Sequence, residues 1–156
     1  MKTATVKELK DELMTYSAPE LMELCLRLSK FKKENKELLT YLLYEAHNED
    51  YYIENVKKDI DLQFKDVNTS SYYYIKKSVR KILTSTKKFI RYSGKKETEI
   101  ALIIYFLQKL KSMKPSYKKN IVLSNSYNTQ LKLIQKRILL LDDDLQYDFS
   151  LEIDLL

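Results

Sequence analysis

The 156-residue chain is 44% hydrophobic and 32% charged, with a net charge of +6, which suits one globular domain with a core of its own. One cysteine excludes an internal disulfide, and one cysteine with one histidine excludes a thiolate-rich zinc site. One glycine and two prolines supply too few turn residues for a β-rich domain, so the composition predicts an all-α protein. The sequence shows no N-terminal secretory signal and no apolar run of about 20 residues, which predicts a cytoplasmic protein without membrane contact.

Three helices are predicted in the first third of the chain. Residues 5–16 repeat apolar side chains at helical spacing, and residues 37–46 carry a wide apolar face. Between them, Ser17 and Glu20 form a capping box with Pro19 in the first turn, so the second helix is expected to begin there. Its buried face is predicted to consist of Leu21, Leu24, Cys25, Leu28 and Phe31.

Four longer helices are predicted after residue 50. They cover residues 50–67, 71–92, 98–113 and 117–141, and Gly94 is placed to end the second of them in a left-handed C-cap. Residues 98–113 form the most hydrophobic of these segments and are predicted to be the most buried. The inward face of the last helix is predicted to carry Val122, Tyr127, Leu131, Ile134, Ile138 and Leu141.

The stretch from Val6-Lys7-Glu8-Leu9 through Leu38-Leu39-Thr40-Tyr41-Leu42-Leu43 resembles the opening of an uncharacterised bacterial all-helical protein family. The resemblance covers about the first third of the chain. It implies a helical fold and carries over no functional residues, because no activity is assigned to that family.

The predicted architecture is about seven antiparallel helices in a single domain, residues 1–141, followed by an acidic tail, residues 142–156. The helices suit either an irregular bundle or a short α-solenoid of the HEAT or armadillo kind. The tail alternates apolar and polar residues, which favours an extended conformation. Leu141, Leu145, Phe149 and Ile153 are also four residues apart, so a helix stays open. An extended tail would lie in a helix groove or pair with a second copy.

The sequence lacks the residues that most classes of enzyme need for catalysis. A phosphate-binding loop needs several glycines, and nucleophilic catalysis would depend on Cys25 and His47, the only residues of their kinds. Cys25 is interpreted as a small core residue, and His47 as part of a solvated turn. No pair of acids is singled out for acid–base work. We therefore expect neither an enzyme nor a bound cofactor or metal ion.

The charges are distributed unevenly along the chain. Residues 76–137 carry 17 basic and only 2 acidic side chains, whereas residues 138–156 carry six acidic and no basic ones. A helix face with positive charge and no interleaved acid suits an anionic partner, and Tyr72-Tyr73-Tyr74 could offer stacking rings. The alternative is a solvated surface helix. The candidate polyanion-binding residues are Lys76, Lys77, Arg80, Lys81, Lys87, Lys88, Arg91, Lys95 and Lys96.

The partner predicted from these features is another protein, or a second copy bound through the tail. The best interpretation is a non-catalytic helical module for protein binding or scaffolding. The alternative is a nucleic-acid-binding protein that uses the basic region 76–137. A further hypothesis is that the acidic tail folds back on the basic face and screens it within the chain.

Overall fold

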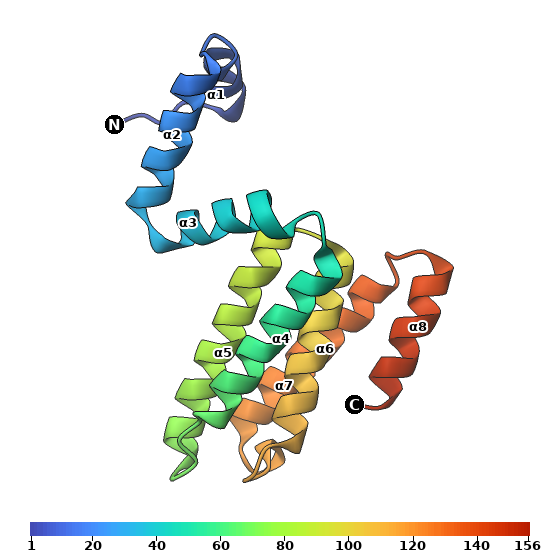
Figure 1. Ribbon diagram of the computed structural model, residues 1–156. Helices are drawn as coiled ribbons and strands as arrows, with labels where there is room; N and C mark the ends of the chain where they lie inside the picture. Colours follow the sequence, from blue (N-terminus) through green and yellow to red (C-terminus); the bar gives the residue numbers. More distant parts are fainter. The chain divides into compact units, whose positions relative to one another are not determined.

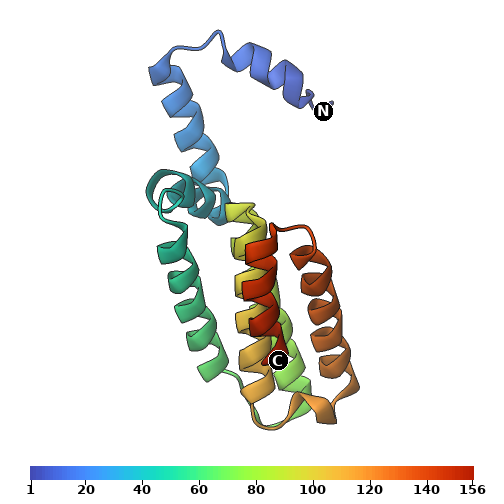
Figure 2. The same cartoon turned by 90° about the vertical axis from the view of Figure 1, so that its right-hand side faces the viewer.

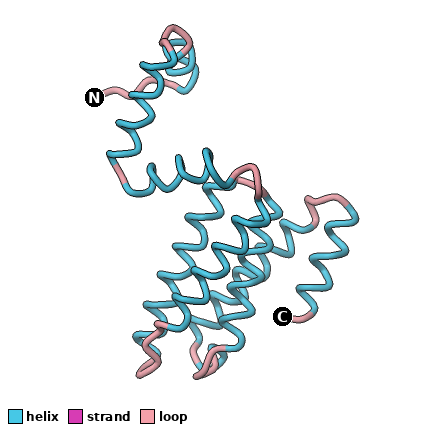
Figure 3. The backbone as a smooth tube through the Cα atoms, viewed as in Figure 1, coloured by secondary structure: helices cyan, strands magenta, loops and turns pink.

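The computed structural model describes all 156 residues and contains eight α-helices and no strand (Figure 3). The chain divides into two compact units, Met1–Tyr44 and Glu45–Leu156 (Figure 1). The prediction of an all-α chain is confirmed, with one helix more than the seven expected. None of the helices combines the length and the apolar content that spanning a membrane requires.

The first unit contains α1 (Val6–Leu13), α2 (Ala18–Phe31) and α3 (Lys33–Thr40), which is followed by one π-helical turn, Tyr41–Glu45. Both of the first two helices begin in a capping box. The backbone N–H of Ser17 donates to the Glu20 carboxylate at 2.8 Å, as the sequence predicted, and Thr5 and Glu8 form the same motif at the start of α1.

The predicted burial of α2 is wrong. No residue of α1, α2 or α3 is buried, and Cys25 is exposed. The amphipathic pattern predicted the helices correctly. A unit of this size, however, has too few neighbouring residues to bury the apolar face of a helix. Large apolar side chains therefore remain in solvent, among them Val6, Met22, Leu28 and Phe31.

The second unit is a bundle built around one central helix, α6 (Lys96–Ser112). The helices α4 (Glu49–Lys65), α5 (Tyr72–Ser93), α7 (Ile121–Ile138) and α8 (Asp143–Asp154) all pack against it (Figures 1 and 2). Because α6 contacts α4 and α8 as well as its chain neighbours α5 and α7, the unit is a compact helical bundle.

The hydrophobicity of α6 explains its central place. Its buried residues cover all of the helix except the half-buried stripe of Ala101, Tyr105 and Gln108, and they include the consecutive Leu102, Ile103 and Ile104. The prediction that this segment is the most buried is confirmed. Its buried residues are Thr98, Ile100, Leu102, Ile103, Ile104, Phe106, Leu107 and Leu110.

The ends of α5 and α7 are set by local chemistry. Gly94 follows α5 in the left-handed conformation, at φ 68°, and its N–H donates to the Ile90 carbonyl, which confirms the predicted cap. Asn120 caps α7 by accepting from the N–H groups of Val122 and Leu123 at 3.1 and 3.3 Å. A short 3₁₀ turn, Tyr117–Lys119, separates α6 from this cap.

The extended tail predicted for residues 142–156 is wrong, because most of this segment forms α8. The four-residue spacing of Leu145, Phe149 and Ile153 prevails over the period of two, and these half-buried side chains form the inner face of α8. A helix satisfies its own backbone groups, whereas a lone strand in a helical bundle has no sheet to join. Lys111 and Tyr127 also donate hydrogen bonds to the carbonyls of Leu155 and Leu156.

Candidate docking groove between α5 and α7

A groove runs between α5 and α7, which both pack on α6 and leave a gap between them. It contains two successive hollows with volumes of about 510 and about 400 Å³. The first is lined by α5 as far as Leu83 and the second begins at Thr84, so the two follow each other along the helix. We call both hollows together the α5–α7 groove.

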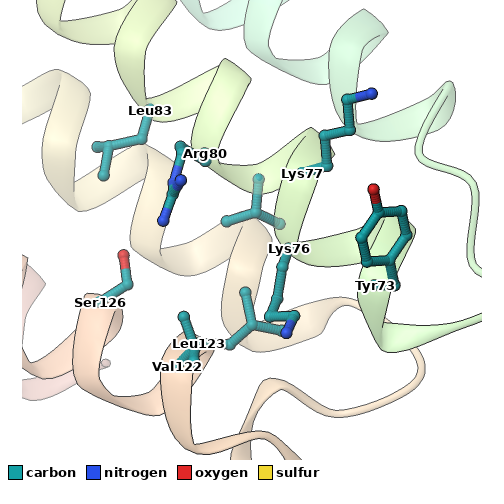
Figure 4. Close-up of a pocket in the computed structure, with 9 residues that line it drawn as sticks. Tyr73, Lys76, Lys77, Arg80, Leu83, Val122, Leu123 and Ser126 are labelled. Atoms are coloured by element: carbon teal, nitrogen blue, oxygen red, sulfur yellow. The ribbon is translucent and has the colours of Figure 1, made fainter.

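The first hollow joins an apolar floor to a basic rim. Val79, Leu83 and Leu123 lie along its floor. Figure 4 shows the guanidinium of Arg80 and the ammonium of Lys76 directed toward α7, while Ser126 presents its hydroxyl from the facing helix. Lys77 points away from α7 in the same view. Such a site suits a ligand with both an apolar and an anionic face. Tyr73 and Val122 complete the lining.

The second hollow contains a buried polar group without a partner. Gln130 lines it, is only 5% exposed, and its Oε1 atom has no hydrogen-bond partner. Leaving a buried acceptor unpaired costs about 1–3 kcal/mol, so the bundle carries this cost beside the hollow. Lys87 and Arg91 lie on the α5 side of the same hollow, and Ile103 of α6 contributes to its lining.

The groove as a whole is positively charged. Five of its lining residues are cations, and Glu99 is its only acid. The Glu99 carboxylate already pairs with the Arg137 Nε at 3.3 Å, so it does little to neutralise the cations of α5. An anionic partner would therefore meet a net attractive field along the groove.

The structure brings together five of the nine candidate basic residues, namely Lys76, Lys77, Arg80, Lys87 and Arg91. The other four lie elsewhere. Lys88 stacks over the Phe89 ring with its Nζ 4.7 Å from the ring centroid, and Lys95 pairs with Glu49 at 3.0 Å. Lys81 and Lys96 are exposed and do not line the groove.

The three consecutive tyrosines differ in their surroundings. The Tyr72 hydroxyl donates to the Ser116 carbonyl at 2.9 Å, which ties the start of α5 to the loop before α7. Tyr73 and Tyr74 contact each other edge to face at 5.2 Å, and only Tyr73 lines the groove. Both of these rings are exposed, and only that of Tyr73 lies at the groove.

The main titratable cluster outside the groove joins α4 to α6. Asp61 pairs with the Lys109 Nζ at 2.7 Å and accepts a hydrogen bond from the Tyr105 hydroxyl at 2.8 Å. Burial acts to raise the pKa of Asp61, but the hydrogen bonds from Lys109 and Tyr105 outweigh it and hold this pKa below its usual value. The hydrogen bond to Asp61 raises the pKa of Lys109. The cluster acts as a tie between two helices.

The contribution of this tie to stability should depend on pH in the acid range. Because the folded state lowers the pKa of Asp61, the stabilisation is complete above about pH 4 and is lost as the pH falls through the folded-state value. Urea midpoints of the wild type and of Asp61→Asn should therefore differ at neutral pH and approach each other as the pH falls below about 4. A difference that stays constant as the pH falls through this range would show that the charge of Asp61 is not its source.

The two residues that nucleophilic catalysis would have used are not among those that line the groove. Cys25 is on the exposed surface of α2, and His47 is exposed in the turn before α4. The structure contains no group of three or more His, Cys, Asp or Glu side chains placed to hold a metal ion.

The sequence analysis did not predict that α7 lines one side of the groove. Val122 was expected to face the core, but Leu123 takes that place, and Val122 lies beside the groove. The sequence does contain a signal for Gln130, because this glutamine lies on the stripe between Tyr127 and Ile134, where an apolar residue is expected. A polar residue on a buried stripe marks either a hydrogen-bonded network or a ligand site.

No family model matches the chain, and comparisons with curated proteins and with solved structures gave no match.

Proposed function

We propose that this protein is a non-catalytic binding module that holds an acidic amphipathic helix of a protein partner in the α5–α7 groove. The observation that carries the proposal is the first hollow, where the cations Lys76 and Arg80 overhang the apolar floor at Val79 and Leu83. A helix-in-groove interaction uses an apolar stripe at positions i, i+4 and i+7, and flanking acids would pair with the rim.

The shape of the site favours a helix over a nucleic acid. Phosphate backbones are bound by polar and cationic surfaces, and single strands need several exposed rings for their bases. Here the cations border an apolar floor, and one tyrosine lines the groove. Lysine and arginine at a rim chiefly steer association and select the partner, while apolar surface that is still accessible, at Leu83, at Val122 and along the stems of the rim cations, would supply binding energy.

A designed peptide tests this proposal directly. The probe is a fluorescein-labelled 15-residue helix with Leu and Tyr at four-residue spacing between rows of Asp and Glu. Its anisotropy should report binding, and a scrambled peptide of the same composition should bind at least about tenfold more weakly because it has no continuous apolar stripe. Reversing two rim charges, Lys76→Glu with Arg80→Glu, should weaken binding by about tenfold or more, chiefly at low salt.

A matched variant separates the groove from net charge. Lys81→Glu with Lys96→Glu makes the same change in charge at exposed positions outside the groove, and it should alter the affinity by less than about twofold. If both variants weaken peptide binding equally, the peptide is attracted to the charge of the whole surface, and the proposal that it binds in the groove is wrong. Binding of a single-stranded oligo-dT probe in preference to the peptide would favour a nucleic-acid partner and overturn the proposal.

A further inference from the structure

The outer face of α8 carries the features of the ligand proposed for the groove, namely an apolar helical stripe bordered by acids. Tyr147, Leu151 and Leu155 follow one another at four-residue spacing and are 67%, 51% and 74% exposed. Residues at this spacing form one stripe on a helix surface. The inner face of α8, with Leu145 and Phe149, is already half-buried, so the stripe is a second apolar face on the same helix.

Acids border this outer stripe. Asp143 and Asp154 lie on one side of it by helical geometry, and Asp148 and Glu152 lie on the other. All four are exposed, and none forms an ion pair in the structure. An apolar stripe with acids on both sides is the charge complement of an apolar floor with cations on its rim.

The dimensions of the two surfaces also agree. The twelve residues of α8 span about 18 Å, and the stretch of α5 from Tyr73 to Leu83 that lines the first hollow spans about 15 Å. The exposed stripe from Tyr147 to Leu155 spans about 12 Å, so it would cover most of the first hollow.

The groove and α8 of one chain cannot meet. α8 packs on α6 and α7, while α5 lies on the other side of α6 in both views (Figures 1 and 2). The hypothesis that the tail screens the basic face within the chain is therefore not supported. The tail's own outer surface stays open to another molecule.

We infer that the occupant of the α5–α7 groove is the outer face of α8 from a second copy of this chain, an inference that rests on the proposed function. Because the two surfaces lie on opposite sides of one molecule, each contact leaves a free groove at one end and a free α8 at the other. Such heterologous contacts form head-to-tail chains, or a ring where the rotation closes, and not two-fold dimers.

Light scattering of the full chain tests this assembly. The average mass should rise steadily between about 10 μM and about 1 mM, the range expected for a small interface, without levelling off at a dimer. Raising the salt concentration should lower the mass, because the contact joins opposite charges at the surface. A chain that stays monomeric throughout, or that saturates as a dimer, would overturn the inference.

Two complementary variants make the test specific. Lys76→Glu with Arg80→Glu disables the groove but keeps α8, and Asp148→Lys with Glu152→Lys disables α8 but keeps the groove. Each variant alone should be monomeric, and mixing them should restore one contact, giving a 1:1 complex that grows no further. The Lys81→Glu and Lys96→Glu variant should assemble like the wild type. All changed residues except the half-buried Lys76 are exposed, and circular dichroism checks that each variant folds.

The outcomes distinguish this inference from the groove itself. Suppose that the Asp148→Lys and Glu152→Lys variant binds the designed peptide but the wild type does not associate with itself. The inference that a second copy occupies the groove is then wrong, while the proposal that the groove is a docking site is retained. If neither interaction occurs, the groove as a docking site is wrong as well. A mixture that contains only monomers would overturn head-to-tail assembly through these two faces.

Discussion

Truncating Phe106 to alanine is expected to lower the free energy of unfolding by about 3–5 kcal/mol. The ring is fully buried in the centre of α6 and lies 5.8 Å from the ring of Phe64 on α4, at an interplanar angle of 50°. The variant would lose the transfer energy of the ring and leave a cavity where α4 and α6 meet. Urea denaturation followed by circular dichroism measures the loss.

Phe31→Ala is the matched control, because it removes the same atoms from an exposed site on α2. It should change the stability by less than about 0.5 kcal/mol. If Phe106→Ala does not fold, Phe106→Leu gives a smaller and measurable loss at the same position. A loss below about 1 kcal/mol for the alanine variant would mean that α6 is not packed as described.

Replacing Glu49 by alanine is expected to cost about 2–4 kcal/mol, the second-largest effect that we predict. Its carboxylate, 16% exposed, accepts hydrogen bonds from the hydroxyls of Ser93 and Thr98 and pairs with Lys95 at 3.0 Å. It thereby connects the start of α4 to the end of α5 and the start of α6. Without it, the buried Thr98 hydroxyl loses its acceptor.

Asp50→Ala provides the control for this variant. Asp50 is exposed in the same first turn of α4, so its loss removes the same favourable charge near the helix N-terminus without stranding a buried group. Its cost should stay at or below about 1 kcal/mol. Thermal unfolding of both variants, together with Glu49→Gln, which retains an acceptor, compares the effects. Equal losses for the two alanine variants would assign the effect of Glu49 to the helix terminus alone.

The helices of this protein were largely predictable, because helix boundaries depend on local chemistry. Ser17 with Glu20 begins α2, and Gly94 ends α5, as their residue types indicated. The apolar run after residue 98 identified the central helix, since a helix that is apolar on all sides has to be surrounded by others. These features need no knowledge of distant parts of the chain.

Burial and assembly were less predictable, because they depend on which surfaces meet. Leu28 and Phe31 repeat like core residues but remain exposed in a unit too small to enclose them. The alternation in the tail suggested a strand, although no sheet exists for it to join. The basic residues of α5 were identified, but the facing wall of the groove comes from α7, whose position beside α5 follows from packing on α6.

The central position of α6 also decides where this sequence can vary. Leu102, Ile103 and Ile104 point in different directions and are all buried, so a change of volume at any of them strains a different neighbour. An ordinary amphipathic helix has one side that accepts most substitutions. Between Leu102 and Leu110 only Tyr105, Gln108 and Lys109 are not buried, so this short segment should be where random mutagenesis finds the fewest tolerated replacements.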